Sequence, residues 1–411
     1  MPTLPSELVD NIIDFLRDET EALRQCCLVS RTWIDPTRKH LFNNVLFKKP
    51  KYLKAWRSTF RNPANSPAKY TRTLAFPHVE MVTDEDASWI RMFTKVTHLE
   101  LGSVARYIGG PRKNGPFTRF HGCSSAVKSL CVGWNELPLR EVFELIRSFP
   151  LLEDLTVSGR GCLHTDEGIS RSPRLRMLTG SLVFEAGEGD FVRRLLELSN
   201  GLCFRNIVWK ENYAAGSERL GELVARCSDT LECVEIDCRT SVKQCSLDSV
   251  SDSASYWFLF VVGPVDLSAA KRLKRVEIEF NSDSYSAAWV TATLDTITPE
   301  HRDFKLVSIY FTDLLQDTSL VGLTKEATYS QWMDLDRNLV RLWESHAIRT
   351  KVAFNVYEGQ TRVTYDDMKY LFREMTTKGR IELVLYVINT ATHRTITSIL
   401  KSPDTGQSIG L

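Results

Sequence analysis

The stretch GRGCLHTDE brings together three side-chain types that enzymes use for nucleophilic catalysis. Cys162, His164 and Asp166 supply a thiol, an imidazole and a carboxylate at alternating positions. A catalytic group is assembled in space from different elements of a fold, and alternation within one glycine-rich connection does not achieve this. We therefore interpret the stretch as a loop between structural units and expect no catalysis from it.

Other kinds of catalytic or metal site are not indicated either. The sequence has no HExxH zinc motif, no GxxxxGK phosphate loop and no GxGxxG fingerprint. Its ten cysteines and eight histidines are dispersed, without a CxxC pair or zinc-type Cys/His spacing. We expect a non-enzymatic protein that needs no metal or cofactor and keeps its cysteines reduced and mostly buried.

The overall charge is nearly balanced. A net charge of +1, with 25% charged and 43% hydrophobic residues, gives no global reason to expect a nucleic-acid or acidic partner. The longest apolar run, residues 256–262, is far shorter than the ~20 residues of a membrane span. Acidic residues interrupt the apolar pattern of the N-terminus, unlike in a secretory signal. We expect a cytoplasmic or nuclear protein without membrane contact.

Residues 36–79 depart from that balance, with ten Lys or Arg and no Asp or Glu. Tyr52, Trp56 and Phe60 recur at i, i+4 and i+8, which predicts one stripe of a helix. Basic residues interleaved with aromatic ones could contact nucleic acid or an anionic membrane. The alternative is a helix whose aromatic stripe packs inward while its lysines are solvated. We favour the alternative, because no nucleic-acid-binding motif accompanies the segment.

A strand-like pattern repeats from about residue 74 onward, as in VTHLELG, VKSLCVG and LKRVEIEF. Each copy has apolar residues at positions 1 and 4, and most have a third at position 6. Helix-like segments such as LREVFELIRSF and FVRRLLELS lie between copies, and the repeat is roughly 20–30 residues long. The fourth positions are Leu74, Leu99, Leu130, Leu155, Leu178, Ile207, Val234, Val276 and Val307.

This period predicts an α/β fold, an irregular leucine-rich-repeat solenoid with parallel strands on the concave face and helices on the convex face. The segments RTKVAFNVY and GRIELVLYV predict two more strands, which either continue or cap the array. Polar strand residues between the apolar ones would face the concave surface and contact a protein partner. The expected target-binding residues are Glu100, Cys131, Thr156, Glu235, Glu277 and Ser308.

The N-terminus is unusually apolar and carries three ordered blocks: LPSELVDNIIDFL, CLVSRTW and LFNNVLF. They predict three short helices, with Ile13, Phe15, Leu41 and Phe42 as internal core. The three blocks resemble an F-box, whose pattern is roughly LPxE(L/I)xxxIxxxL, then LVCRxW, then LFxxVxF. With irregular leucine-rich repeats behind it, the chain is similar to F-box-like proteins of a type common in fungi.

The resemblance implies a substrate receptor of a cullin–RING ubiquitin ligase. The three helices would bind a Skp-family adaptor, and the repeats would hold an unidentified target protein. It also implies the division 1–48 F-box-like domain, 49–72 basic helical linker, 73–400 solenoid and 401–411 disordered tail. Trp33 is the expected hot spot, because buried aromatics usually dominate such interfaces. The implied adaptor-binding residues are Leu4, Pro5, Leu8, Ile12, Leu28, Val29, Ser30 and Trp33.

Two further hypotheses belong to other classes of protein. The N-terminal helices could be only a cap on a leucine-rich-repeat scaffold, because repeat arrays need polar terminal caps. Alternatively, the chain could be a nucleic-acid-associated protein that uses residues 36–79, which predicts steeply salt-dependent binding.

Overall fold

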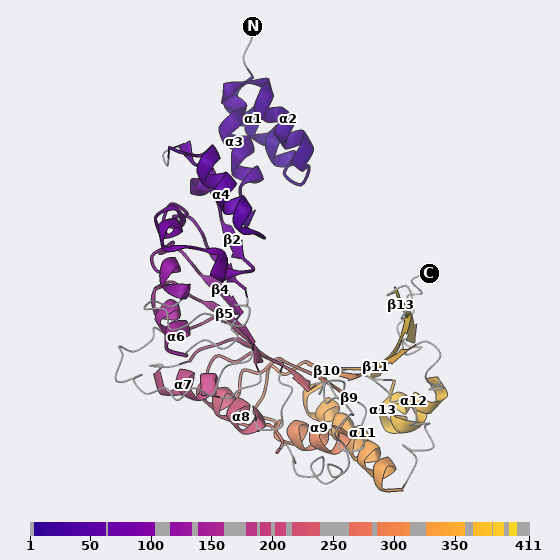
Figure 1. Ribbon diagram of the computed structural model, residues 1–411. Helices are drawn as coiled ribbons and strands as arrows, with labels where there is room; N and C mark the ends of the chain where they lie inside the picture. Colours follow the sequence, from indigo (N-terminus) through magenta and orange to yellow (C-terminus); the bar gives the residue numbers. More distant parts are fainter. Residues whose placement is uncertain are drawn as a thin grey trace, which may run out of the picture. The chain divides into compact units, whose positions relative to one another are not determined.

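The chain forms two compact units, Met1–Leu178 and Thr179–Leu411, each described here by itself. The structure is a computed structural model (Figure 1). It describes residues 4–62, 65–102, 116–133, 139–159, 178–186, 190–198, 202–210, 216–238, 263–281, 286–312, 326–357, 365–379, 381–389 and 394–400.

Three short helices form the start of the first unit: α1 (Ser6–Phe15), α2 (Thr20–Val29) and α3 (Arg31–Leu41). We call them the helical head. Ser30 begins α3 as its N-cap, because its hydroxyl accepts a hydrogen bond from the backbone N–H of Thr32 at 3.3 Å. Three helices form here, as expected, although the block LFNNVLF lies mostly beyond the end of α3.

A parallel sheet of five strands follows in the first unit, and each strand pairs with the next along the chain. Leu74, Leu99, Leu130 and Leu155 lie in register across it, and all four are fully buried. The strands are β1 (Asn44–Leu46), β2 (Thr73–Phe76), β3 (His98–Leu101), β4 (Ser129–Gly133) and β5 (Asp154–Gly159).

Helical segments cover one side of these strands. The α-helices are α4 (Pro50–Thr59), α5 (Ala87–Ile90) and α6 (Leu139–Arg147). Short 3-10 turns complete the set: η2 (Pro67–Tyr70), η3 (Val79–Met81), η4 (Asp84–Asp86) and η5 (Pro116–Phe120). The alternation of strand and helix is the predicted repeat unit.

The segment 49–72 is not a linker, and the sheet does not begin at residue 73. Val45 in β1 pairs in register with Leu74 in β2, so the first repeat begins inside the predicted F-box-like domain. Helix α4 is the helical half of that repeat, because Leu53 is buried and Trp56 lies 5.7 Å from Phe47 between ring centroids. We name 49–72 the α4 segment.

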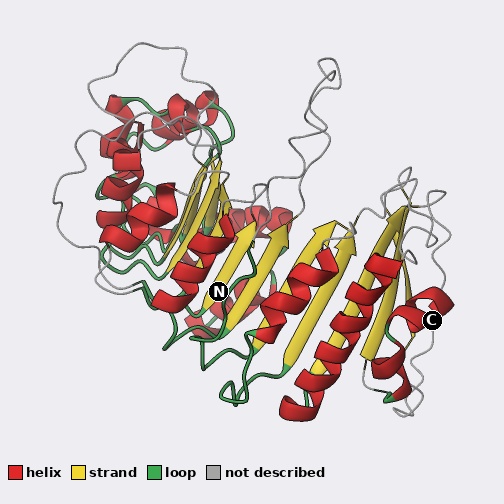
Figure 2. Ribbon diagram, turned by 90° about the horizontal axis from the view of Figure 1, so that it is seen from below, coloured by secondary structure: helices red, strands yellow, loops and turns green. Residues whose placement is uncertain are grey.

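The second unit repeats the same arrangement with longer strands. Seven strands pair in parallel, and Figure 2 shows helices on one face of the strands. They are β6 (Ser181–Ala186), β7 (Asn206–Lys210), β8 (Cys233–Cys238), β9 (Arg275–Asn281), β10 (Leu306–Thr312), β11 (Arg349–Tyr357) and β12 (Ile381–Asn389).

The helices of the second unit occur where the apolar helical periods predict them, with α9 in addition. They are α7 (Asp190–Leu198), α8 (Gly216–Arg226), α9 (Ser286–Asp295), α11 (Glu326–His346), α12 (Tyr365–Leu371) and α13 (Arg373–Thr377). Among the described residues, no helix is both long and apolar enough to cross a membrane.

One repeat is anchored at a different residue from the predicted one. Ile207 pairs with Leu182, whereas Leu178 is a buried residue before β6. The steps from Leu155 to Leu182 and on to Ile207 become 27 and 25 residues, instead of the irregular 23 and 29 that Leu178 implies. The true period is more even than the sequence pattern suggested.

The last described strand reverses direction. β11 and β12 continue the parallel ladder, whereas β13 (Arg394–Leu400) pairs with β12 in the antiparallel sense. Residues 345–400 therefore continue the strand order and end in a hairpin. The predicted tail 401–411 lies outside the described residues.

Candidate partner-binding surface on the helical head

The helical head has a small core. Val9, Ile13, Leu23 and Cys26 are buried in it, and the partly buried Leu16, Trp33 and Leu41 pack against them. Ile13 is fully buried, as expected for an internal residue. Four buried apolar side chains are few for three helices, because small folding units bury a small share of their surface.

The outer side of the head, in contrast to its core, exposes large hydrophobic side chains. Among the described residues, ten large hydrophobic side chains are exposed, and six of them lie on α1, on α2 or just before α1. Such a concentration of exposed apolar side chains marks an interaction surface more often than scattered single ones do. The six are Leu4 (52%), Leu8 (48%), Ile12 (39%), Phe15 (88%), Leu28 (80%) and Val29 (64%). We call them the outer apolar face.

Most residues assigned from the F-box resemblance are exposed. Leu4, Leu8, Ile12, Leu28 and Val29 belong to the outer apolar face. Pro5 and Ser30 are exposed as well, and the Ser30 hydroxyl lies 3.0 Å from the hydroxyl of Thr32. Ser30 thus has a capping role that requires no partner.

Phe15 lies on the side of α1 opposite to the one we expected, and Trp33 contacts the head core while it stays partly exposed. Trp33, the predicted hot spot, is half-buried and packs against the head core. Phe15, predicted to be internal, is 88% exposed, because Val9 and Ile13 already fill the inner side of α1. Phe15 lies three residues after Ile12, and that helical spacing would have placed it on the outer stripe.

Polar contacts join the helices of the head to one another and join the head to the first repeat. His40 Nε2 lies 2.7 Å from Asp14 Oδ1 and joins α3 to α1. Tyr70 donates its hydroxyl hydrogen to Asp35 at 2.7 Å and joins η2 to α3. Phe42, expected to be head core, instead packs edge-on against Trp56, with ring centroids 5.6 Å apart. The outer apolar face is therefore presented on a fixed base.

The segment that carries this face also carries exposed acidic side chains. Residues 4–30 carry six Asp or Glu against two Arg. Both arginines have acidic partners, since Arg17 pairs with Asp18 at 3.3 Å and Arg24 pairs with Glu21 at 3.2 Å. A partner that covers the apolar centre would therefore meet a net negative rim.

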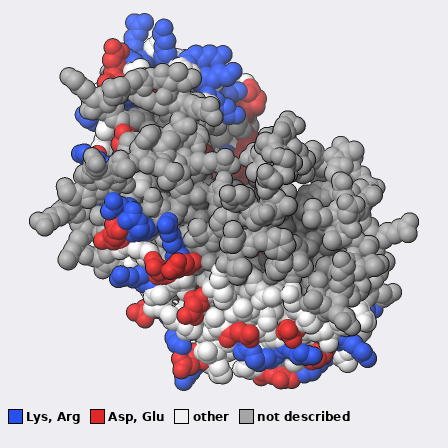
Figure 3. Space-filling model, turned by 60° about the horizontal axis from the view of Figure 1, so that its bottom comes forward, with Lys and Arg blue, Asp and Glu red and all other residues white. Residues whose placement is uncertain are grey.

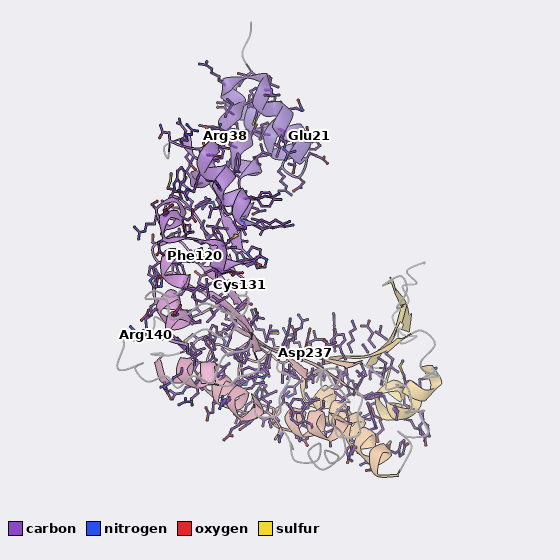
Figure 4. All side chains as sticks on the ribbon, in the orientation of Figure 1. Glu21, Arg38, Phe120, Cys131, Arg140 and Asp237 are labelled. Carbon is purple, nitrogen blue, oxygen red and sulfur yellow. The ribbon has the colours of Figure 1, made fainter. Side chains whose placement is uncertain are left out.

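The polar strand face of the first unit is uncharged apart from a few positions. Glu100 is exposed, whereas Cys131 and Thr156 are half-buried. Figure 4 shows Cys131 on the strands and Arg140 on the helix side, so the two faces are distinct. His98 Nδ1 lies 2.8 Å from Ser129 Oγ on the neighbouring strand. The three predicted residues are in register on adjacent strands.

The strand face of the second unit is more charged, and its predicted residues differ in access. Glu235 and Glu277 pair in register and are half-buried, and Glu277 forms an ion pair with Arg275. Ser308 is only 3% exposed and cannot contribute much contact surface. It lies in register between Glu277 and Lys351, whose longer side chains flank it.

The described residues offer little for catalysis. Burial raises the pKa of the Cys123 and Cys227 thiols to about 12, so their thiolates are scarce at neutral pH. In the described ranges, no three His, Cys, Asp or Glu side chains gather in a way that would hold a metal ion. Cys162, His164 and Asp166 lie outside the described residues.

Comparison with known proteins identifies no relative. No protein-family model matches the chain, and a search of the curated proteins finds no similar sequence.

Proposed function

We propose that the chain is a substrate receptor of a cullin–RING ubiquitin ligase. Its helical head would bind a Skp-family adaptor as an F-box does, and its repeats, as an irregular leucine-rich-repeat solenoid, would hold a target protein. The proposal assigns the chain no catalytic residue. It contributes by holding the target close to the ubiquitin-charged enzyme.

The observation that carries the proposal is the outer apolar face. Five of its six members stand at positions that the F-box resemblance assigns to adaptor contact. Burying one leucine side chain in an interface contributes roughly 1.5–3 kcal/mol, so several of them support a stable complex. The small head core supports it too, because a partner would add burial that the head lacks.

The decisive experiment measures binding of the full chain to a purified Skp-family adaptor by calorimetry. We expect Leu8→Ala combined with Leu28→Ala to weaken binding at least tenfold, because the two substitutions remove apolar area that the complex would bury. Trp33→Ala is a poor test, because it also removes packing from the head core.

Leu151→Ala is the matched control for that experiment. Leu151 is 49% exposed and Leu8 is 48% exposed, so the two leucines differ in place and not in accessibility. The control variant should bind the adaptor like the wild type. The proposal would be contradicted if the wild type did not bind the adaptor or if the double variant bound it with unchanged affinity.

One observation favours the scaffold with an N-terminal cap. β1 and Phe47 belong to the first repeat, because Phe47 is 2% exposed and stacks on Phe76 with centroids 5.2 Å apart. Deleting residues 1–48 would therefore damage the repeats under either hypothesis. Affinity purification with mass spectrometry distinguishes the receptor hypothesis from the scaffold hypothesis, because only the receptor hypothesis predicts that adaptor and cullin co-purify with the chain.

A further inference from the structure

The α4 segment and its flanks carry positive charge and have no acidic residue of their own. Residues 36–79 contain ten of the 52 basic residues and none of the 51 acidic ones. Eight of these ten are exposed, and the other two, Arg38 and Arg57, are half-buried. The exposed ones are Lys39, Lys48, Lys49, Lys51, Lys54, Arg61, Lys69 and Arg72.

Ion pairing does not neutralise this surface. Within the described part of the chain, Arg57 alone among the ten has carboxylate partners, Asp86 at 2.7 Å and Glu85 at 3.8 Å. On other helices, basic side chains form ion pairs within the helix. On α6, for example, Arg140 pairs with Glu144 at 2.7 Å. Figure 3 likewise shows blue and red side chains interspersed at its lower edge, and mainly blue ones at its upper end.

The lysines are placed where their charges add to that of a helix end. Lys49 is the N-cap of α4, Lys48 precedes it and Lys51 lies in the first turn, which has no acidic residue. The N-terminal end of a helix is itself positive, so lysine there is unfavourable unless an anion is nearby. Lys54 follows Lys51 by three residues and is also exposed, which places it on the same side of the helix.

One aromatic ring lies among these lysines. Tyr52, predicted to pack inward, is 45% exposed, and Lys51 Nζ lies 5.4 Å from its ring centroid. Leu53, Trp56 and Phe60 turn inward instead, because the apolar side of α4 is centred on Leu53, which is 3% exposed. Packing therefore explains the inner aromatics and leaves Tyr52 and the lysines without a function in the fold.

We propose that Lys48, Lys49, Lys51, Tyr52 and Lys54 form a binding surface for a single-stranded nucleic acid. The lysines would contact successive phosphates, and Tyr52 would stack on one base. This surface is separate from the outer apolar face and carries a function in addition to adaptor binding.

The make-up of the surface favours nucleic acid over an acidic protein. Protein interfaces usually have an apolar core, whereas the only large apolar side chains exposed in the described part of 36–79 are Leu46 and Tyr52. Lysine binds phosphate as a point charge, which suits a flexible backbone without a fixed geometry. An exposed ring beside lysines is what sequence-tolerant single-strand binding uses.

The test is fluorescence anisotropy of the full chain with labelled oligo(U) and oligo(dT) of about 20 nucleotides. Four phosphate contacts predict a slope of roughly −3 in log affinity against log salt concentration. Lys49→Ala, Lys51→Ala and Lys54→Ala together should flatten that slope and abolish measurable binding at physiological salt. Tyr52→Ala alone should weaken binding about tenfold, with the slope unchanged, because stacking carries no charge.

The control variant removes three exposed cations elsewhere: Lys95→Ala, Arg302→Ala and Lys305→Ala. It has the same net charge as the lysine variant and should bind like the wild type. Circular dichroism of each variant verifies its fold, and Lys51→Glu with Lys54→Glu serves as a second variant that should also abolish binding.

Two further probes decide the class of partner. Polyglutamate and phosphatidylserine vesicles are measured at the same salt concentration, and we expect both to bind at least tenfold more weakly than the oligonucleotides. Tighter binding of either probe, a flat salt response, or equal loss in the control variant would overturn the proposal. Adaptor binding should be unchanged in the lysine variant, so failure of one proposal leaves the other standing.

Discussion

The helical head and the strand repeats distribute apolar side chains in opposite ways. Each repeat turns its apolar residues inward: Leu74, Leu99, Leu130 and Leu155 form a fully buried row. In the head, six large apolar side chains point outward while four are buried. A repeat is completed by its neighbours. In the described part of the chain the head packs against the first repeat, and its outer apolar face is exposed.

Polar contacts show the same contrast. One buried carboxyl in the repeats has two internal partners: Asp336, on α11, accepts hydrogen bonds from the backbone N–H groups of Glu374 at 2.7 Å and Met375 at 3.2 Å. In the head, the side-chain contact that joins α3 to α1, His40 to Asp14, is at the surface. We expect the same kind of substitution to have unequal effects on stability in the two regions, because the head buries fewer apolar side chains than the repeats do.

The largest effect is expected in the core of the first repeat. Phe76 is fully buried and contacts Phe47 and Phe120, with ring centroids 5.2 and 5.1 Å away. Phe76→Ala should lower the free energy of unfolding by about 3–5 kcal/mol, because it removes apolar burial and leaves a cavity. Urea unfolding followed by fluorescence measures it. Phe15→Ala, at an 88% exposed site, should change stability by less than about 0.5 kcal/mol.

A smaller effect is expected in the head core, where adjacent isoleucines form a matched pair. Ile13 is fully buried and Ile12 is 39% exposed. Ile13→Ala should destabilise the head by about 2–4 kcal/mol, and Ile12→Ala should cost clearly less. Limited proteolysis should cut α1–α3 faster in the first variant, while the repeats stay protected. If the two substitutions destabilised the head equally, the assignment of Ile13 to the inner side of α1 and Ile12 to its outer side would be contradicted.

Much of the fold could be predicted from sequence because the repeat pattern reports burial directly. In a strand whose alternate residues are buried, a run such as LxxLxL fixes both the strand and its inner side. The exception at Leu178 arose because a second apolar pair, Leu182 and Phe184, follows within one strand length. β1 was missed because three residues give too short a run for alternation to show.

The surface was harder to predict because a helix with apolar residues on two sides can bury either side. α1 has apolar residues on both: Val9 and Ile13 inside, Leu8, Ile12 and Phe15 outside. Helical period alone separates the two sets without saying which is inner. α4 shows the same limit, since Tyr52 continues the spacing of Trp56 and Phe60 and yet is exposed. Packing partners decide the side, and these come from distant segments.

A pH-dependent effect on stability is expected at Asp336. Burial raises the pKa of its carboxyl above the ordinary 3.8, although the two backbone N–H groups oppose the rise. A carboxyl whose pKa is higher in the folded state binds more protons there than when unfolded, so its contribution to stability falls as pH rises through that raised pKa. Asp336→Asn should lack this decline.

The measurement compares wild type and Asp336→Asn by urea unfolding from just above pH 3.8 to neutral pH. The wild type should lose stability relative to the variant as pH increases. A constant difference, or one of opposite sign, would show that the N–H groups of Glu374 and Met375 outweigh burial. The head has no such buried carboxyl in its described residues, so variants there should show no matching trend.

The smallest effect on stability is expected at the outer apolar face. Leu28 is 80% exposed near the end of α2, and alanine is an equally good helix former, so Leu28→Ala should change the free energy of unfolding by less than about 0.5 kcal/mol. Binding of a hydrophobic dye to the free chain should decrease instead, because exposed apolar area is removed. A loss above about 1 kcal/mol would mean that Leu28 packs within the chain. The head would then be a closed cap, and its contrast with the repeats would disappear.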